Sequence, residues 1–165
     1  MPASKPLAAL LASVWNALGA PVRRRLTWLI HAKFAHGVSG LILDPQGRVL
    51  LLKHRFWVNQ PWGLPSGMAR HGESLAATLK REMIEETGLP VTPRKLLRLG
   101  TKSHGYSQFY LLADCAGEPR VVSSEIMEAR FYTPADLPEN LLPSHRALIQ
   151  EYMEKGTLPG IDLEN

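Results

Sequence analysis

Cysteine is almost absent from this chain of 165 residues, since Cys115 stands alone. One cysteine excludes an intramolecular disulfide and a metal centre built from several thiolates. Because Cys115 lies in the apolar run FYLLADC, we expect a buried structural thiol in a reducing compartment. Repeats are also lacking, and no apolar run reaches the roughly 18 residues that a membrane-spanning helix needs. The length and the 45% hydrophobic content predict one domain with extensions.

Acidic residues are missing from residues 1–36, which hold five basic residues. The remainder of the chain holds 14 basic and 15 acidic residues, so the whole net charge of +4 comes from the N-terminal segment. The remainder also lacks a basic patch with interleaved aromatic residues and any DNA-binding motif. We therefore do not expect a nucleic-acid partner.

The segment 1–36 has the apolar spacing of two amphipathic helices, interrupted at Gly19-Ala20-Pro21. Such an apolar face needs a partner, and three stay open. These are the rest of the chain, a second subunit in a homodimer, and an anionic membrane surface that a basic helix contacts peripherally. A secretory signal is disfavoured because three arginines follow a poor cleavage region, and a mitochondrial leader because serine is sparse. We expect a cytoplasmic protein, with membrane association as the open alternative.

Strand-like and helix-like segments alternate after residue 36. The apolar runs 37–43 and 49–53 flank Asp44-Pro45-Gln46-Gly47, a strong turn signal that predicts a hairpin. Further strands are expected over 96–103, 107–114 and 130–133, and a last helix over 144–155. These elements predict an α+β fold, with a domain over 37–156 and a tail over 157–165.

Residues 74–87 predict a helix of about four turns, ended by Gly88. On this helix Glu82, Glu85 and Glu86 are three and four residues apart, so their carboxylates share one face. Three like charges on one face repel each other unless a cation neutralises them. Oxygen-only ligands suit Mg²⁺ or Mn²⁺, so the segment predicts a site for a divalent metal ion.

The segment 67–89, GMARHGESLAATLKREMIEETGL, resembles the Nudix box. The pattern of that box is Gly, five residues, Glu, seven residues, then Arg-Glu-apolar-any-Glu-Glu-any-Gly-apolar. Every specified position is filled, by Gly67, Glu73, Arg81, Glu82, Met83, Glu85, Glu86, Gly88 and Leu89. Trp62-Gly63-Leu64-Pro65 is similar to the strand and loop that usually enter the box, and the resemblance extends more loosely over 37–155. Ser66 departs from the pattern, where a second glycine is common.

The resemblance to the Nudix hydrolase superfamily, which is MutT-like, implies an α/β/α sandwich with a mixed sheet. It implies metal-assisted hydrolysis of the diphosphate linkage in a small molecule, a nucleoside diphosphate joined to another group. By the same resemblance Glu82, Glu85 and Glu86 are metal ligands. Glu73 and Arg81 correspond to a supporting ion pair. Gly67 and Gly88 correspond to structural turns that enter and leave the helix.

The general base and the substrate contacts are less specific in the sequence. The resemblance implies that the base comes from the box itself or from a later loop, where Glu125 and Glu128 are the candidates. Phosphate groups call for basic side chains and a base calls for a stacking aromatic residue. The candidates near strand ends are Arg55, Trp57, Arg70, Lys102 and Tyr106.

Three functions other than hydrolysis of a nucleoside diphosphate derivative are also conceivable. A ligand-sensing Nudix domain would bind without turnover, but it would not need an intact acidic set. A relative of isopentenyl-diphosphate isomerase would need a reactive cysteine, whereas Cys115 sits in an apolar run. The apolar N-terminal segment also allows hydrolysis of a lipid-linked diphosphate at the membrane face.

Overall fold

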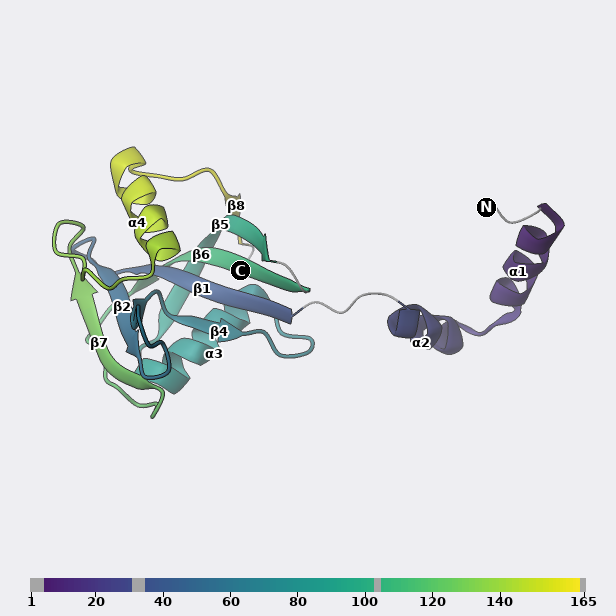
Figure 1. The fold of residues 1–165 in the computed structure, drawn as a ribbon, viewed down its shortest axis with the longest axis horizontal. Coiled ribbons are helices and arrows are strands. Elements are labelled where there is room, and N and C mark those ends of the chain that lie inside the picture. The colour runs from purple at the N-terminus through teal and green to yellow at the C-terminus, as the bar shows by residue number, and fades with distance from the viewer. Residues whose placement is uncertain (1–4, 31–34, 103–104, 164–165) are drawn as a thin grey trace. The chain divides into compact units, whose positions relative to one another are not determined.

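The computed structural model of the chain describes residues 5–30, 35–102 and 105–163, and divides into two compact units, residues 1–33 and 34–165 (Figure 1). The first unit holds helices α1 (Lys5–Ala17) and α2 (Ala20–Ile30). The break between them falls at Leu18 and Gly19, so Ala20 and Pro21, which we expected in the break, begin α2 instead. Among the residues described, no helix is long and apolar enough to cross a membrane.

The second unit is built on one mixed sheet. Its described strands are β1 (Ala35–Leu43), β2 (Val49–His54), β3 (Trp62–Gly63), β4 (Ser66–Met68), β5 (Val91–Lys102), β6 (Tyr106–Cys115), β7 (Ile126–Tyr132) and β8 (Ile161–Asp162). The order is β3-β2-β1-β6-β5-β8, with β4 beside β1 and β7 beside β2. Strands β1 and β6 are parallel, and the other strand pairs are antiparallel.

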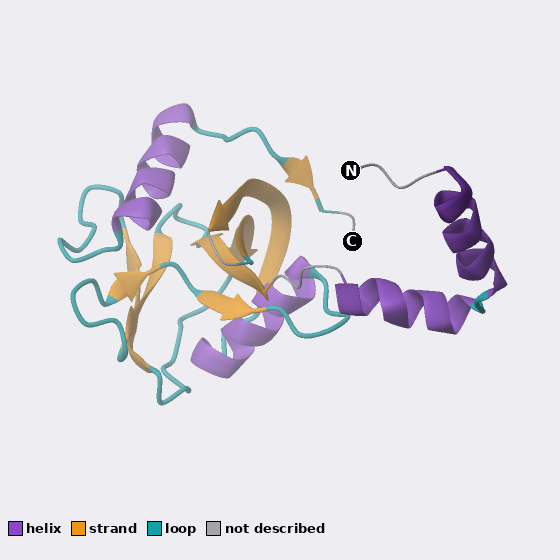
Figure 2. Ribbon diagram, turned by 45° about the vertical axis from the view of Figure 1, so that its right-hand side comes forward, coloured by secondary structure: helices purple, strands orange, loops and turns teal. Residues whose placement is uncertain are grey.

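Helices α3 (Leu75–Thr87) and α4 (Pro143–Lys155) cover opposite faces of this sheet (Figure 1, Figure 2). Alternation along each strand separates two cores, because successive side chains point to opposite faces. Leu50 and Leu52 of β2 pack with α3, whereas Leu51 packs with α4. The α+β prediction and its α/β/α form are therefore confirmed.

The end of the chain differs from the prediction. We expected residues 157–165 to be a tail, but Ile161 and Asp162 pair with Leu96 and Lys95 and add β8 to the sheet. Gly160 permits this pairing, because a Cβ there would overlap the Leu96 carbonyl. A strand of two exposed residues has no periodicity that sequence inspection can detect.

Helix α3 lies close against β1. Ser74 caps its start, since the Ser74 Oγ accepts from the Ala77 N–H at 3.1 Å. Gly88 ends it in the left-handed conformation with φ 63°, which glycine adopts without strain. Between these ends, Leu79 packs directly over Gly40 of β1, where a Cβ would lie 2.8 Å from Leu79 Cδ1.

We predict that Gly40→Ala lowers the free energy of unfolding by about 1–3 kcal/mol, because the added methyl group overpacks the contact with Leu79. Urea unfolding followed by circular dichroism measures the change. Gly100→Ala is the matched control on β5, since the nearest atom to a Cβ there, the Gln108 carbonyl oxygen, is 3.9 Å away. Equal effects of the two substitutions would contradict the packing argument.

Candidate active site

Strand β4 passes so close to α3 that only glycine fits at position 67. Gly67 pairs with Val38 of β1, and a Cβ on Gly67 would overlap the Glu82 side chain. The prediction that Gly67 forms a turn into the helix is therefore wrong. Gly67 lies within a strand, and the turn that precedes α3 contains Gly72, whose φ is 78°. The glycine is required because backbone and carboxylate approach each other closely.

Arg81 joins three parts of the site through its guanidinium group. Its Nε and Nη2 donate to the two carboxylate oxygens of Glu73 at 2.8 and 3.0 Å, which confirms the expected ion pair. Its Nη1 donates to Glu82 at 2.7 Å and to Glu85 at 3.1 Å, and its Nη2 also reaches the Met68 carbonyl at 2.9 Å. Arg81 thus ties α3 to β4 and to the loop between them.

The charges of this network shift its protonation equilibria. The guanidinium of Arg81 and the backbone N–H of Arg70 lower the pKa of Glu73 to about 2. The hydrogen bonds of Arg81 to Glu73, and then to Glu82 and Glu85, raise the pKa of the guanidinium above its usual value. Glu73 and Arg81 are therefore both charged over the whole range of pH in which the protein would work.

Glu86 is the one glutamate of α3 that is buried. Its side chain is buried, and its Oε2 has no hydrogen-bond partner among the described residues. Burial, followed by the charges of Glu82, Glu125 and Glu85, raises the pKa of Glu86 to about 8. A buried, unpaired carboxylate beside three others is unfavourable by itself, and a bound cation would remove that penalty.

The donor chemistry of this cluster fits a hard divalent cation, which prefers oxygen ligands. Among the described residues, no three His, Cys, Asp or Glu side chains form a ready metal cage. The reason lies in the salt bridges, since Glu82 and Glu85 both face Arg81, and Glu85 also bonds Arg70 at 3.1 Å. Arg81 contacts Glu82 through Oε1, whereas both carboxylate oxygens of Glu85 bond arginine, so an ion competes with arginine mainly at Glu85.

The profile of the NUDIX domain matches residues 33–152, well over half of the sequence. The chain belongs to the Nudix family. Its Nudix box is the segment that forms β4, the following loop and α3, and the members of this family use a divalent metal ion.

Several known proteins are similar to this Nudix chain. The ADP-ribose pyrophosphatase of Methanocaldococcus jannaschii is 30% identical over 129 residues, 72% of this chain and 73% of that protein. Nucleoside diphosphate-linked moiety X motif 6 of Xenopus laevis is 33% identical over 82 residues, 46% of this chain. The match spans only 38% of the Xenopus protein. The crystal structure of a MutT NUDIX hydrolase from Burkholderia pseudomallei superposes with a TM-score of 0.62 at 26% identity, covering 72% of this chain and 98% of that one.

The structure separates the two loop glutamates considered as general bases. Glu125 lies near Glu86, because the Glu86 carbonyl accepts from Val122 N–H at 2.9 Å and holds this loop against α3. Glu128 instead bonds Lys53 at 2.6 Å. Its neighbour on β7 pairs with Leu52, which faces α3, so Glu128 faces the α4 side of the sheet. Only Glu125 joins the helix glutamates.

The predicted substrate contacts fall into separate groups. Arg70 bonds Glu85, and the Arg55 Nε donates to the Ser124 carbonyl at 2.9 Å, next to Glu125. Lys102 ends β5, and its side chain lies outside the described part of the structure. Trp57 and Tyr106 line one cavity of about 140 Å³.

Most residues that line this cavity were not among the predicted substrate contacts. Ser39, Ser66 and Gln108 contribute hydrogen-bonding groups, and His145 of α4 closes one side. Their signal in the sequence is a buried polar residue in an apolar strand, as in GVSGLIL and YSQFYLL. Such a residue needs a partner within the protein or a ligand.

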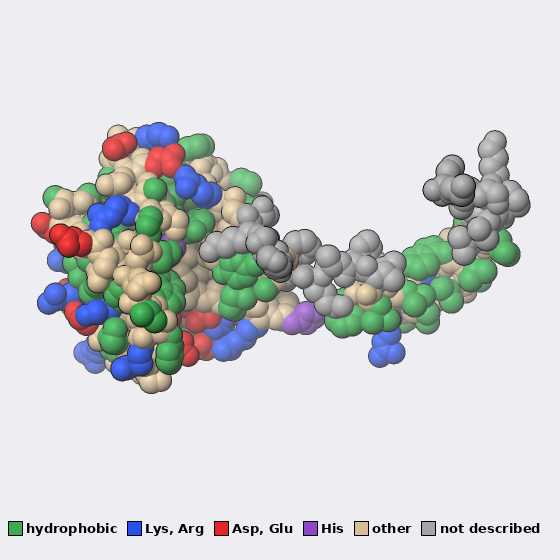
Figure 3. All heavy atoms as spheres, viewed as in Figure 1, with side chains coloured by type: hydrophobic (Ala, Val, Ile, Leu, Met, Phe, Trp, Pro, Cys, Tyr) green, Lys and Arg blue, Asp and Glu red, His purple; other side chains and the backbone are tan. Residues whose placement is uncertain are grey.

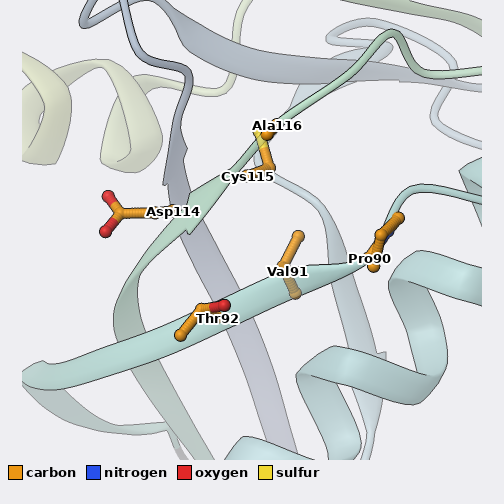
Figure 4. Close-up of a pocket in the computed structure, with 6 residues that line it drawn as sticks. All are labelled: Pro90, Val91, Thr92, Asp114, Cys115 and Ala116. Carbon is orange, nitrogen blue, oxygen red and sulfur yellow. The ribbon is translucent and has the colours of Figure 1, made fainter.

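A second hollow lies between the ends of β5 and β6, around Cys115 (Figure 4). The Sγ of Cys115 donates to the Leu43 carbonyl at 3.5 Å, and burial raises the pKa of the thiol to about 11. The expected buried thiol is therefore present, and it is poorly suited to nucleophilic chemistry. Asp114 points away from Cys115 in Figure 4 and is paired with Arg94 at 2.7 Å.

We predict that Gly67→Ala weakens the rise in melting temperature that Mg²⁺ produces, because the new methyl group displaces the Glu82 carboxylate. Differential scanning fluorimetry with and without Mg²⁺ measures this effect. Met68→Ala is the control on the same strand, since its side chain is 46% exposed. An unchanged response to Mg²⁺ in Gly67→Ala would show that Glu82 has no part in holding the ion.

We also predict a pH dependence that comes from His54. Its imidazole stacks on Trp57 with 3.8 Å between ring centroids, and burial lowers its pKa from 6.5 to about 4. The unfolded chain therefore binds a proton at a pH where the folded protein does not. The free energy of unfolding is therefore not reduced by this group above pH 6.5, and it decreases by roughly 2–3 kcal/mol as the pH falls toward 4.

Melting temperatures from pH 7.5 to 4.5 test this prediction. His54→Phe keeps an aromatic ring against Trp57 but cannot bind a proton, so its melting temperature should fall less on acidification. Parallel pH profiles for the two proteins would contradict the assignment.

Proposed function

We propose that the chain is a hydrolase that cleaves the diphosphate linkage of a nucleoside diphosphate derivative with Mg²⁺ or Mn²⁺. The observation that carries the proposal is the buried Glu86, whose Oε2 has no hydrogen-bond partner among the described residues, beside three more carboxylates within a complete Nudix box. The names of the relatives support it, since one is an ADP-ribose pyrophosphatase and another carries the term nucleoside diphosphate-linked.

A diphosphate is anionic and repels a hydroxide nucleophile, so a bound divalent ion would supply neutralising charge and orient the attacking water. In this proposal Glu82 and Glu86 would hold the ion, and Glu85 would assist them. Arg81 and Glu73 position these ligands without touching the substrate. Arg81 is well placed for this, because its four partners, Met68, Glu73, Glu82 and Glu85, all belong to the Nudix box.

Proton transfer in this proposal falls to Glu125. Its side chain is exposed, so it can reach a water molecule, and it lies close enough to Glu86 to affect the Glu86 pKa. Arg55, whose backbone N–H donates to the Glu125 carbonyl at 2.8 Å, and Arg70, beside Glu85, would bind phosphate oxygens.

We predict that Glu86→Gln lowers turnover by at least about 100-fold, because the amide keeps the shape of the side chain but binds a cation poorly. Phosphate release is measured with Mg²⁺ or Mn²⁺ over nucleotide sugars, ADP-ribose, nucleoside triphosphates, dinucleoside polyphosphates and prenyl diphosphates. Glu154→Gln, an exposed glutamate of α4, is the control.

Full activity of Glu86→Gln would overturn its assignment as a ligand. If no substrate is hydrolysed but a nucleotide raises the melting temperature, a ligand-sensing domain would be favoured. Turnover of prenyl diphosphates alone would favour a lipid-linked substrate.

We further propose that residues 1–36 contact an anionic membrane surface from one side. Large apolar side chains of this unit are solvent-exposed, among them Leu10 and Leu29 at 61% and 62%, and Figure 3 shows hydrophobic side chains along its surface. Arg23 and Arg25 lie on either side of the stripe formed by Val22 and Leu29 on α2. Because no acidic residue occurs here, an anionic surface complements the segment better than the nearly neutral remainder of the chain.

We predict that the full chain sediments with phosphatidylserine vesicles and far less with phosphatidylcholine vesicles. Leu29→Asp should weaken the association, whereas Thr27→Asp places the same charge on the polar side of α2 and should change it less. Undiminished association after deletion of residues 1–36 would contradict the proposal. So would a dimer that dissociates on the same deletion without any vesicle binding, because a second subunit would then be the partner of the apolar face.

A further inference from the structure

The cavity under Trp57 lies across β4 from the glutamate cluster. Ser66 and Gly67 are consecutive, so their side-chain positions point to opposite faces of the strand. Gly67 faces Glu82, whereas Ser66 lines the cavity. One strand therefore separates the proposed metal ligands from this cavity, and a substrate that crosses the short edge strand can occupy both.

The size of the cavity limits what it can hold. Its volume is about 140 Å³. A protein cavity of roughly 150 Å³ accommodates one benzene ring. The volume therefore matches one six-membered ring better than the fused rings of a purine.

The wall of the cavity is an aromatic plane held in position. The Trp57 indole stacks on His54 with an interplanar angle of 15°. The Cζ3 atom of the indole also lies against Gly63, where a Cβ would be 2.5 Å from it. Trp57 is thus a preformed surface for stacking, although its neighbours Phe56 and Val58 are 71% and 91% exposed.

The floor of the cavity is a directional chain of hydrogen bonds. The Tyr106 hydroxyl donates to Gln108 Oε1 at 2.5 Å, and Gln108 Nε2 donates to the Ser39 Oγ at 2.9 Å. The Ser66 hydroxyl donates its one proton to the Leu64 carbonyl, so Ser39 must be the donor in the 2.6 Å bond between the two serines. Lone pairs on Ser39 and Ser66 and the second amide N–H of Gln108 then remain for a ligand edge.

The lining is also uncharged. None of the described residues around the cavity is an acid, a lysine or an arginine. His145 accepts the Leu64 N–H at its Nδ1 at 3.0 Å, which requires the neutral imidazole. A neutral ring that carries both a donor and an acceptor on its edge matches this environment.

We propose that this cavity binds the pyrimidine base of the substrate, and that Trp57 determines the preference for pyrimidine over purine derivatives. The inference rests on the proposed hydrolase function and narrows its substrate class. It departs from the relative named for ADP-ribose, whose base is a purine.

UDP-glucose and ADP-glucose test the inference, because they carry the same sugar and differ only in the base. We expect kcat/KM for UDP-glucose to exceed that for ADP-glucose by at least about tenfold, with Mg²⁺ or Mn²⁺ present. Trp57→Ala should lower the UDP-glucose value by about 5- to 100-fold, the usual loss for one stacked base, and remove the preference. Trp57→Phe should retain most of it, since phenylalanine also offers a flat ring.

The outcomes separate this inference from the hydrolase proposal. Equal turnover of UDP-glucose and ADP-glucose, or preference for ADP-glucose, would overturn the pyrimidine assignment. The proposed hydrolase function would still hold. If neither UDP-glucose nor ADP-glucose is hydrolysed, the hydrolase proposal fails for these substrates. Calorimetric binding of UMP and AMP to the wild-type and Trp57→Ala proteins then tests the base preference by itself. Tighter binding of UMP that weakens in Trp57→Ala would support the cavity assignment without turnover, and absence of a difference would overturn it.

Discussion

The guanidinium of Arg81 is the contact on which the arrangement of this site depends. A carboxylate on the loop, a carbonyl on β4 and two carboxylates on α3 all converge on this one cation. Its planar set of donors allows several such contacts at once, which a lysine could not make. Because the guanidinium is fully charged, it holds Glu73 and Glu82 close together. The Oε2 of the buried Glu86 has no hydrogen-bond partner among the described residues.

Two glycines bring the helix close enough for this network to form. Gly40 lets Leu79 of α3 pack on β1, and Gly67 lets the Glu82 carboxylate pass against β4. The same strand then presents Ser66 to the cavity under Trp57. The sandwich therefore places a region suited to a cation and a region suited to a flat neutral ring on the two sides of one short strand.

The features of the site that depend on local spacing along the chain are predictable from the sequence. The features that depend on strand pairing are not. The helix, its glutamates and the Arg81–Glu73 pair follow from separations of a few residues. The direction of Glu128 follows instead from its register with Lys53, and the cavity brings together residues as distant as Ser39 and His145. The role of Gly67 was missed because close approach of strand and helix, unlike a turn, has no signature within the strand itself.

The central claim is that the carboxylates of α3 bind a divalent cation through the buried Glu86. Electron paramagnetic resonance of Mn²⁺ titrated into the full chain tests it directly, because bound and free Mn²⁺ give different signals. We expect saturable Mn²⁺ binding by the wild-type protein. The Mn²⁺ affinity should be strongly reduced in Glu86→Gln and unchanged in Glu154→Gln. Equal Mn²⁺ affinity in the wild-type and Glu86→Gln proteins would contradict it.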